Sequence, residues 1–116
     1  MHEGAIAQSL LNLANLNFHR SGLKKITRVK VVIGKLHNVI DEVLVMHFDL
    51  LKRDMNGFRE AILEIEKKEV VIKCMQCGME KTLNEVDFTC SSCESTSTEV
   101  TSGNELHIEC IEGTED

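Results

Sequence analysis

Four cysteines arranged as two C-x-x-C pairs constrain the fold of this chain more than any other feature. The pairs are Cys74/Cys77 and Cys90/Cys93, and twelve residues separate them. Zinc takes four soft ligands in a tetrahedron, and two residues between cysteines allow one tight turn to direct both sulfurs at one ion. Gly78 gives the first turn a flexible backbone. The spacing therefore predicts a hairpin that brings two turns onto one structural zinc ion, with all four positions filled by protein.

The zinc prediction depends on the compartment, because disulfides persist only where the environment is oxidising. The N-terminus lacks the basic-then-apolar layout of a signal peptide, and no apolar run approaches the length of a membrane span, so we expect a cytoplasmic protein. A thiol redox enzyme stays open as an alternative, although such enzymes usually carry one C-x-x-C pair rather than two. Counting reactive thiols before and after chelation distinguishes the two, because structural zinc masks four thiols.

Hydrophobic periodicity predicts two helices and three strands in the rest of the chain. Apolar residues recur every three or four positions in the helical segments and alternate in the strand-like ones. The predicted order is helix 3–20, strand 24–34, helix 39–55, strand 61–73, the cysteine module, a polar loop over 94–103 and a last strand over 104–112. Cys110 alternates with Leu106 and Ile108 in the last strand, so we expect a small buried residue there rather than a ligand.

This order indicates an α+β fold, an α/β sandwich that contains an inserted zinc-binding unit. A lone strand cannot bury its face by itself, so the last strand is expected to return to the first sheet. We therefore expect a small α/β domain over residues 1–73, completed by the final strand within 104–116, and a zinc-ribbon-like domain over 74–103.

The first three residues, Met1, His2 and Glu3, crowd an imidazole and a carboxylate against the α-amino group. The amine, the backbone nitrogen of residue 2 and the imidazole form fused chelate rings, and such nitrogen-rich planar sets suit Ni(II) or Cu(II). Glu3 adds either its backbone nitrogen or its carboxylate. The site requires a free amine, and the large His2 disfavours removal of Met1. A histidine near a chain start is common, so this spacing by itself is a weak signal.

Charge and composition narrow the function classes. The net charge is −6, Trp and Tyr are absent, and there are four Phe. Nucleic-acid binders usually carry basic surfaces and stacking aromatics, so the composition argues against that class. A zinc-ribbon interaction module that binds nucleic acid or a protein partner is the alternative, which a gel shift at low salt tests. We find no nucleophile–base pair, phosphate loop or open metal site, so we do not expect an enzyme.

The combined motifs resemble the hydrogenase maturation nickel metallochaperone family of the HypA type. The resemblance rests on the MHE start, the amphipathic helix, the V-x-V-V-I-G strand end and the paired cysteines, and it covers essentially the whole chain. It implies a domain of two helices on a three-stranded sheet, with a zinc domain inserted before the last strand. It implies nickel on Met1, His2 and Glu3, and structural zinc on the four cysteines.

The same resemblance implies a function and a set of partners. The protein would deliver Ni(II) to the large subunit of nickel–iron hydrogenase, together with a maturation GTPase and, in some members, urease maturation factors. We expect a monomer or a homodimer and no nucleic-acid or membrane partner. One departure concerns the loop GKLHNVID, where Lys35 replaces an acid that is common beside the glycine. His37 and Asp41 are therefore open candidates for additional nickel ligands.

Overall fold

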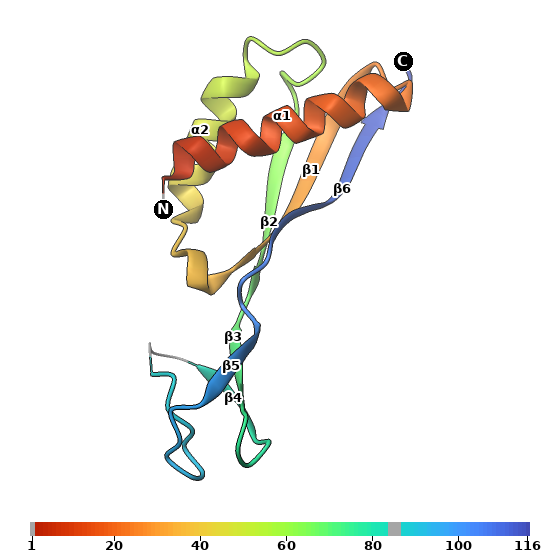
Figure 1. The fold of residues 1–116 in the computed structure, drawn as a ribbon. Coiled ribbons are helices and arrows are strands. Elements are labelled where there is room, and N and C mark those ends of the chain that lie inside the picture. The colour runs from red at the N-terminus through yellow and green to blue at the C-terminus, as the bar shows by residue number, and fades with distance from the viewer. Residues whose placement is uncertain (1, 84–86) are drawn as a thin grey trace.

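Two small three-stranded sheets form the two lobes of the molecule (Figure 1). The structure is a computed structural model that describes residues 2–83 and 87–116. The molecule measures 57 × 24 × 16 Å, and its radius of gyration is 17.7 Å. A compact chain of this length would have a radius of gyration of about 13 Å. The lobes are therefore arranged end to end rather than packed into one sphere.

The first lobe contains two helices and the sheet of order β2-β1-β6, and the second contains the sheet of order β4-β3-β5. The elements are α1 Glu3–Ser21, β1 Lys25–Gly34, the 3-10 turn η1 Lys35–His37, α2 Asp41–Lys52, β2 Ile62–Lys68, β3 Val70–Cys74, β4 Glu80–Leu83, β5 Thr98–Ser102 and β6 Leu106–Thr114. In the described part of the chain, no helix is long and apolar enough to cross a membrane.

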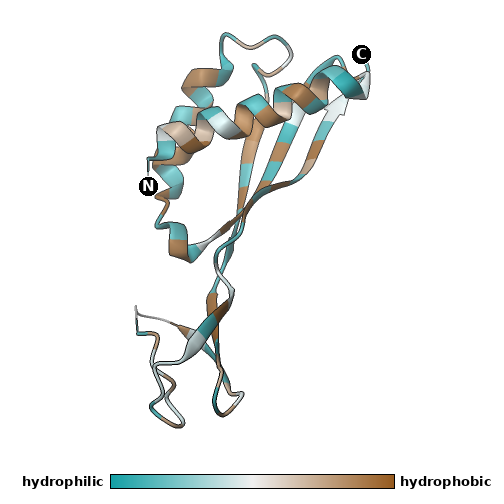
Figure 2. Cartoon of the chain, viewed as in Figure 1, coloured by the Kyte–Doolittle hydropathy of each residue, from teal (hydrophilic) through white to brown (hydrophobic). Residues whose placement is uncertain are grey.

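Strand β1 is the centre of the first sheet. It pairs in parallel with β2 and antiparallel with β6, so the last strand does return to the first sheet. The strands of this sheet alternate between hydrophilic and hydrophobic residues (Figure 2). Val29, Val31 and Ile33 belong to the buried core, as the alternation predicted. The fold class predicted from the sequence, two helices on a three-stranded sheet with an inserted four-cysteine unit, is confirmed.

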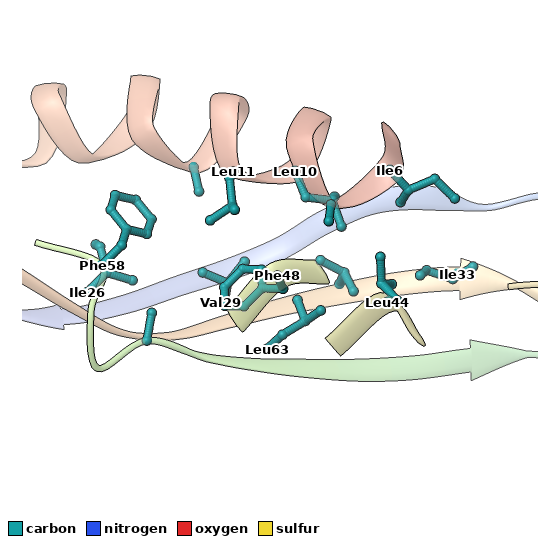
Figure 3. Packing of buried hydrophobic residues seen from close by; sticks show 14 of the residues in the cluster. Ile6, Leu10, Leu11, Ile26, Val29, Ile33, Leu44, Phe48, Phe58 and Leu63 are labelled. Carbon is teal, nitrogen blue, oxygen red and sulfur yellow. The ribbon is translucent and has the colours of Figure 1, made fainter. Parts of the chain in front are cut away.

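The core of the first lobe lies between the two helices and one face of the sheet. Figure 3 shows Leu10 and Leu11 of α1 pointing toward the strands, with Phe48 of α2 and Val29 of β1 in the same cluster. Helix α1 repeats its buried residues at helical spacing, and the cluster's members there are Ile6, Ala7, Leu10, Leu11 and Ala14. The helix ends at Gly22, whose φ of 78° is a conformation that favours glycine.

Salt bridges connect the three strands of the first sheet. Arg28 of β1 pairs with Glu64 of β2 and, at 2.8 Å, with Glu112 of β6. Lys30 of β1 likewise lies between carboxylates of β2 and β6, which are Glu66 at 3.4 Å and Glu109 at 2.9 Å. Each central cation therefore joins all three strands, and we call these two rows the charge ladder.

In the described part of the second lobe, the buried apolar cluster consists of Val70, Ile72 and Leu83. Leu36 of η1 packs against this cluster from the first lobe. The lobe is therefore short of buried apolar area, and it depends on other interactions for its order.

The backbones of the two lobes cross at a pair of glycines. A Cβ atom added to Gly34 would lie 1.9 Å from the carbonyl oxygen of Gly103, so a side chain there would overlap the crossing strand. The Gly34 N–H donates to the Glu105 carbonyl at 2.8 Å, and the Leu36 N–H donates to the Gly103 carbonyl at 3.0 Å. The end of β1 is thus hydrogen bonded directly to the chain that links β5 to β6.

Two strand predictions differ from the structure. The single strand predicted over 61–73 is broken at Glu69 into β2, which belongs to the first sheet, and β3, which belongs to the second. The polar segment predicted as a loop over 94–103 contains β5, which pairs with β3 through its backbone. The second sheet therefore begins at Val70, and the division into functional domains at residues 73/74 stays a prediction.

The prediction for Cys110 is wrong, because this residue is exposed. The register between β1 and β6 shifts after Lys30, which pairs with Cys110, whereas Val31 pairs with Ile108. This irregularity breaks the period of two along β6, so Ile108 and Ile111 both pack against the core and Cys110 does not.

Candidate metal centres

The four paired cysteines converge at the far end of the second lobe. Their sulfur atoms all lie within 4.8 Å of one another. The Cys74 and Cys93 sulfurs are 3.5 Å apart, and the Cys77 and Cys90 sulfurs are 3.6 Å apart. A zinc–sulfur bond of about 2.3 Å gives tetrahedral sulfur–sulfur distances of roughly 3.8 Å. The donor set and its spacing therefore fit one zinc ion.

Each C-x-x-C pair forms a tight turn, as the spacing predicted. Gly78 donates its N–H to the Cys74 carbonyl at 3.0 Å, and Glu94 donates its N–H to the Cys90 carbonyl at 2.9 Å. Gly78 adopts a φ of 78° and Glu94 a φ of 61°, so both turns end in a left-handed residue. Cys74 enters from β3, which explains why that strand runs directly into the site.

Backbone amides stabilise the thiolate form of the first cysteine in each turn. The Cys77 N–H, followed by that of Gln76, lowers the pKa of Cys74 to about 6. The Cys93 N–H, followed by that of Ser92, lowers the pKa of Cys90. Thiolates are the species that ligate metal, so these amides favour metal binding at Cys74 and Cys90, whereas the neighbouring cysteines raise the pKa of Cys77 and Cys93.

In the first lobe, the predicted nickel residues His2 and Glu3 lie at the start of α1. His2 is exposed, and its carbonyl accepts the Ala5 N–H at 3.1 Å and the Ile6 N–H at 3.2 Å. Glu3 directs its carboxylate to α2, where Oε2 accepts the Ile40 N–H at 3.0 Å. This N–H, followed by that of Glu3 itself, lowers the pKa of the Glu3 carboxyl group. Met1 lies outside the described residues, so its predicted role is untested.

His37 and Asp41, the two open candidates, have other partners. The Nε2 atom of His37 is 3.1 Å from the Asn104 carbonyl at the crossing of the lobes. The Oδ1 atom of Asp41 is 3.1 Å from the Lys67 ammonium, a contact that is an ion pair without an aligned hydrogen bond. In the described ranges, only the four cysteines form a convergent group of three or more metal-ligating side chains.

A further histidine, His107 of β6, shares a groove with His2. The groove lies between α1 and β6, and apolar side chains such as Leu13 and Leu106 line most of it. His107 is exposed. Its nearness to the N-terminus of α1 depends on the pairing of β6 with β1, which the sequence alone does not fix.

The match of the chain to known proteins spans both candidate centres. Residues 1–113 match the family described as "Hydrogenase/urease nickel incorporation, metallochaperone, hypA". The chain belongs to the HypA family. The family resemblance predicted from the sequence is therefore confirmed, and with it the link to nickel and to hydrogenase maturation.

Similar HypA proteins cover almost the same length as this chain. The hydrogenase maturation factor HypA of Moorella thermoacetica is 40% identical over 113 residues, which are 97% of this chain and 99% of that protein. The corresponding protein of Aquifex aeolicus is 37% identical over 113 residues, 97% of this chain and 96% of that protein. The solution structure of the nickel metallochaperone HypA from Helicobacter pylori covers both chains completely, with 27% identity and a TM-score of 0.72.

Proposed function

We propose that this chain is a nickel metallochaperone that binds Ni(II) at its N-terminus and delivers it to the large subunit of nickel–iron hydrogenase. The match to the HypA family, which begins at residue 1 and includes the MHE start, is the observation that carries this proposal. The ligands are the Met1 amine, the imidazole and backbone nitrogen of His2, and Glu3. His2 is exposed, which supports the handover of a metal ion to another protein.

The terminal site suits a cargo rather than a resident cofactor. An exposed terminus gives up a metal with little rearrangement of the core. The zinc ion, by contrast, would be held by four protein ligands, which are Cys74, Cys77, Cys90 and Cys93. Zinc there is structural and leaves no open position for catalysis. The protein therefore acts as a carrier and not as an enzyme.

The proposal includes the partners and the location that the family implies. The maturation GTPase and the hydrogenase large subunit are the main partners, and urease maturation factors are a further set. We place the exchange in the cytoplasm, where thiols stay reduced and the zinc site persists.

Nickel binding by calorimetry tests the terminal site. The protein is zinc-loaded, and the native chain is compared with a version whose α-amino group is acetylated. We expect the native form to bind one nickel ion and the acetylated form to lose that binding, because acetylation removes the primary amine beside His2. Equal binding by both forms would overturn the terminal assignment. Absence of binding in both would favour the interaction-module alternative.

A further inference from the structure

The carboxylate of Glu3 has a backbone partner outside its own helix. Its Oε2 atom accepts the Ile40 N–H at 3.0 Å, thirty-seven residues further along the chain. Ile40 is the N-cap residue of α2, and its aliphatic side chain cannot supply a capping oxygen. In a capping box, a glutamate in the first turn of a helix binds the N-cap N–H of that same helix. Here a glutamate from α1 performs this function for α2.

The electrostatics of α2 favour this arrangement. The N-terminus of a helix carries a partial positive charge, so a carboxylate is stabilised there. A hydrogen bond with an ionised acceptor is also stronger than one between neutral groups. For the Glu3 carboxylate to coordinate nickel through Oε2, it would have to leave this position and give up both interactions.

The receiving end of the contact is attached to the sheet. The Lys67 ammonium of β2 donates to the Val39 carbonyl at 2.9 Å and lies 3.1 Å from Asp41 Oδ1. These two contacts flank Ile40 on either side. The N-terminus of α2 is therefore fixed to β2, and any group that binds it becomes fixed as well.

The two helices also approach closely beside this contact. A Cβ atom added to Gly4 would lie 3.3 Å from the His47 ring of α2. The start of α1 is thus in van der Waals range of α2 at the residue that follows Glu3. The hydrogen bond from Ile40 therefore lies at an existing helix–helix contact.

We propose that Glu3 is a positioning residue for nickel rather than a carboxylate ligand, because its side chain fastens the start of α1 to the N-terminus of α2. This inference rests on the proposed function, and it limits the contribution of residue 3 to the metal to its backbone nitrogen. The nickel ligands before Glu3 are then presented from a fixed anchor. Loss of the anchor accelerates nickel release without changing the ligand set.

The experiment compares three substitutions in zinc-loaded protein with its native start. Glu3→Ala removes the acceptor, Glu3→Gln keeps a neutral acceptor, and Ile40→Pro removes the donor while leaving Glu3 intact. The φ of Ile40 is −87°, near the value that proline requires. Ile40→Ala keeps the N–H and is the reference for the proline variant. Glu42→Ala, which removes an exposed acid in the first turn of α2, is the control for lost charge.

The readouts are the rate of nickel transfer to EDTA and the d–d absorption bands of bound Ni(II). We expect Glu3→Ala and Ile40→Pro to accelerate release by about three- to tenfold, as the loss of one helix cap would suggest. We expect Glu3→Gln to stay within about twofold of wild type, because its amide oxygen still accepts one hydrogen bond. Band positions should not move in any variant. The double variant Glu3→Ala/Ile40→Pro should release nickel no faster than either single one.

The opposite pattern would overturn the proposal. If Glu3→Ala and Glu3→Gln both shift the absorption bands while Ile40→Pro behaves as Ile40→Ala, the carboxylate is a nickel ligand. If Ile40→Pro does not fold, the two Glu3 variants still give a decision.

An NMR measurement on the nickel-free protein separates this proposal from the proposed function. The Ile40 amide proton should move upfield in Glu3→Ala and exchange faster with solvent, whether or not nickel binds the terminus. An unchanged Ile40 amide would exclude the hydrogen bond itself. Failure of the native chain to bind nickel, with a shifted Ile40 amide, would instead contradict only the proposed function.

Discussion

At the scale of single residues, Gly34 and Gly103 determine how closely the two lobes approach each other. Gly34 has an ordinary φ of −73°, so its backbone conformation does not require glycine. The requirement is steric, because the carbonyl of Gly103 occupies the space of a Cβ atom. Gly22 is the reverse case, with a φ of 78° and no atom within 4 Å of the point that a Cβ would occupy.

We therefore predict that Gly34→Ala destabilises the protein more than Gly22→Ala does. The first substitution forces two crossing backbones apart and should cost about 3 kcal/mol, near the upper end for overpacking. Gly22→Ala should cost about 1 kcal/mol, because alanine would have to adopt a left-handed backbone conformation. Urea unfolding followed by circular dichroism measures both values. Equal costs would mean that the crossing relaxes freely.

Single residues also mark the limit of what the sequence predicts. The C-x-x-C turns are local, so their spacing was sufficient to place all four sulfurs together. The contact between Glu3 and Ile40 spans 37 residues, and no periodic pattern encodes it. Cys110 was predicted on the buried face of β6, but the register of β6 against β1 shifts beside it. The alternation of polar and apolar residues in the sequence does not reveal such a shift.

At the scale of elements, the charge ladder holds three strands in register across an exposed face. Arg28 interacts with both neighbouring strands, and its hydrogen bond is the main reason that the pKa of Glu64 is lowered. A carboxylate with a lowered folded-state pKa stabilises the fold above its unfolded value of about 4.5, and this contribution is lost as the pH falls through the folded-state pKa.

We predict that Arg28→Met lowers stability slightly at pH 7 and that the difference from wild type shrinks as the pH falls below about 4.5, where Glu64 becomes protonated. The effect at pH 7 is small because exposed ion pairs contribute little. Urea midpoints at pH 7 and pH 3 measure it. Arg59→Met is the matched control, because Arg59 forms no ion pair with any residue that the structure describes. A difference that is independent of pH would contradict this prediction.

The elements that the sequence missed are those without a hydrophobic pattern. Both helices, β1 and β6 lie close to their predicted ranges, because apolar residues recur along each of them. Strand β5 is mostly polar and exposed, and its order comes from backbone pairing with β3. The break at Glu69 was missed because apolar residues continue on both sides, and only the topology reveals that β2 and β3 belong to different sheets.

At the scale of the whole molecule, the two lobes are stabilised in different ways. The first lobe has a continuous core between helices and sheet, whereas the residues described in the second lobe give a cluster of three buried apolar side chains and the cysteine cluster. A lobe of this size without a substantial core usually needs a metal or a disulfide. Its order should therefore be coupled to zinc.

We predict that removal of zinc unfolds the second lobe and leaves the first lobe folded. Chelation should collapse the dispersion of amide signals from 70–83 and 98–102 in an NMR spectrum, while signals from α1 and α2 persist. Addition of zinc should restore the spectrum. Retention of the dispersed signals after complete chelation would show that the small core is sufficient, and simultaneous loss of both sets would show that the lobes fold as one unit.

The position of β6 in the first sheet also fixes an order of assembly during synthesis. The partner that completes β1 on one side is the last strand to leave the ribosome, after the whole of β3, β4 and β5. Until β6 is synthesised, the core beneath α1 lacks Ile108 and Ile111, which pack against it from that strand. Zinc can therefore bind the second lobe on the nascent chain before β6 completes the first sheet. A chain made without zinc still gains that strand when β6 emerges, so it becomes a folded first lobe attached to an unordered second lobe.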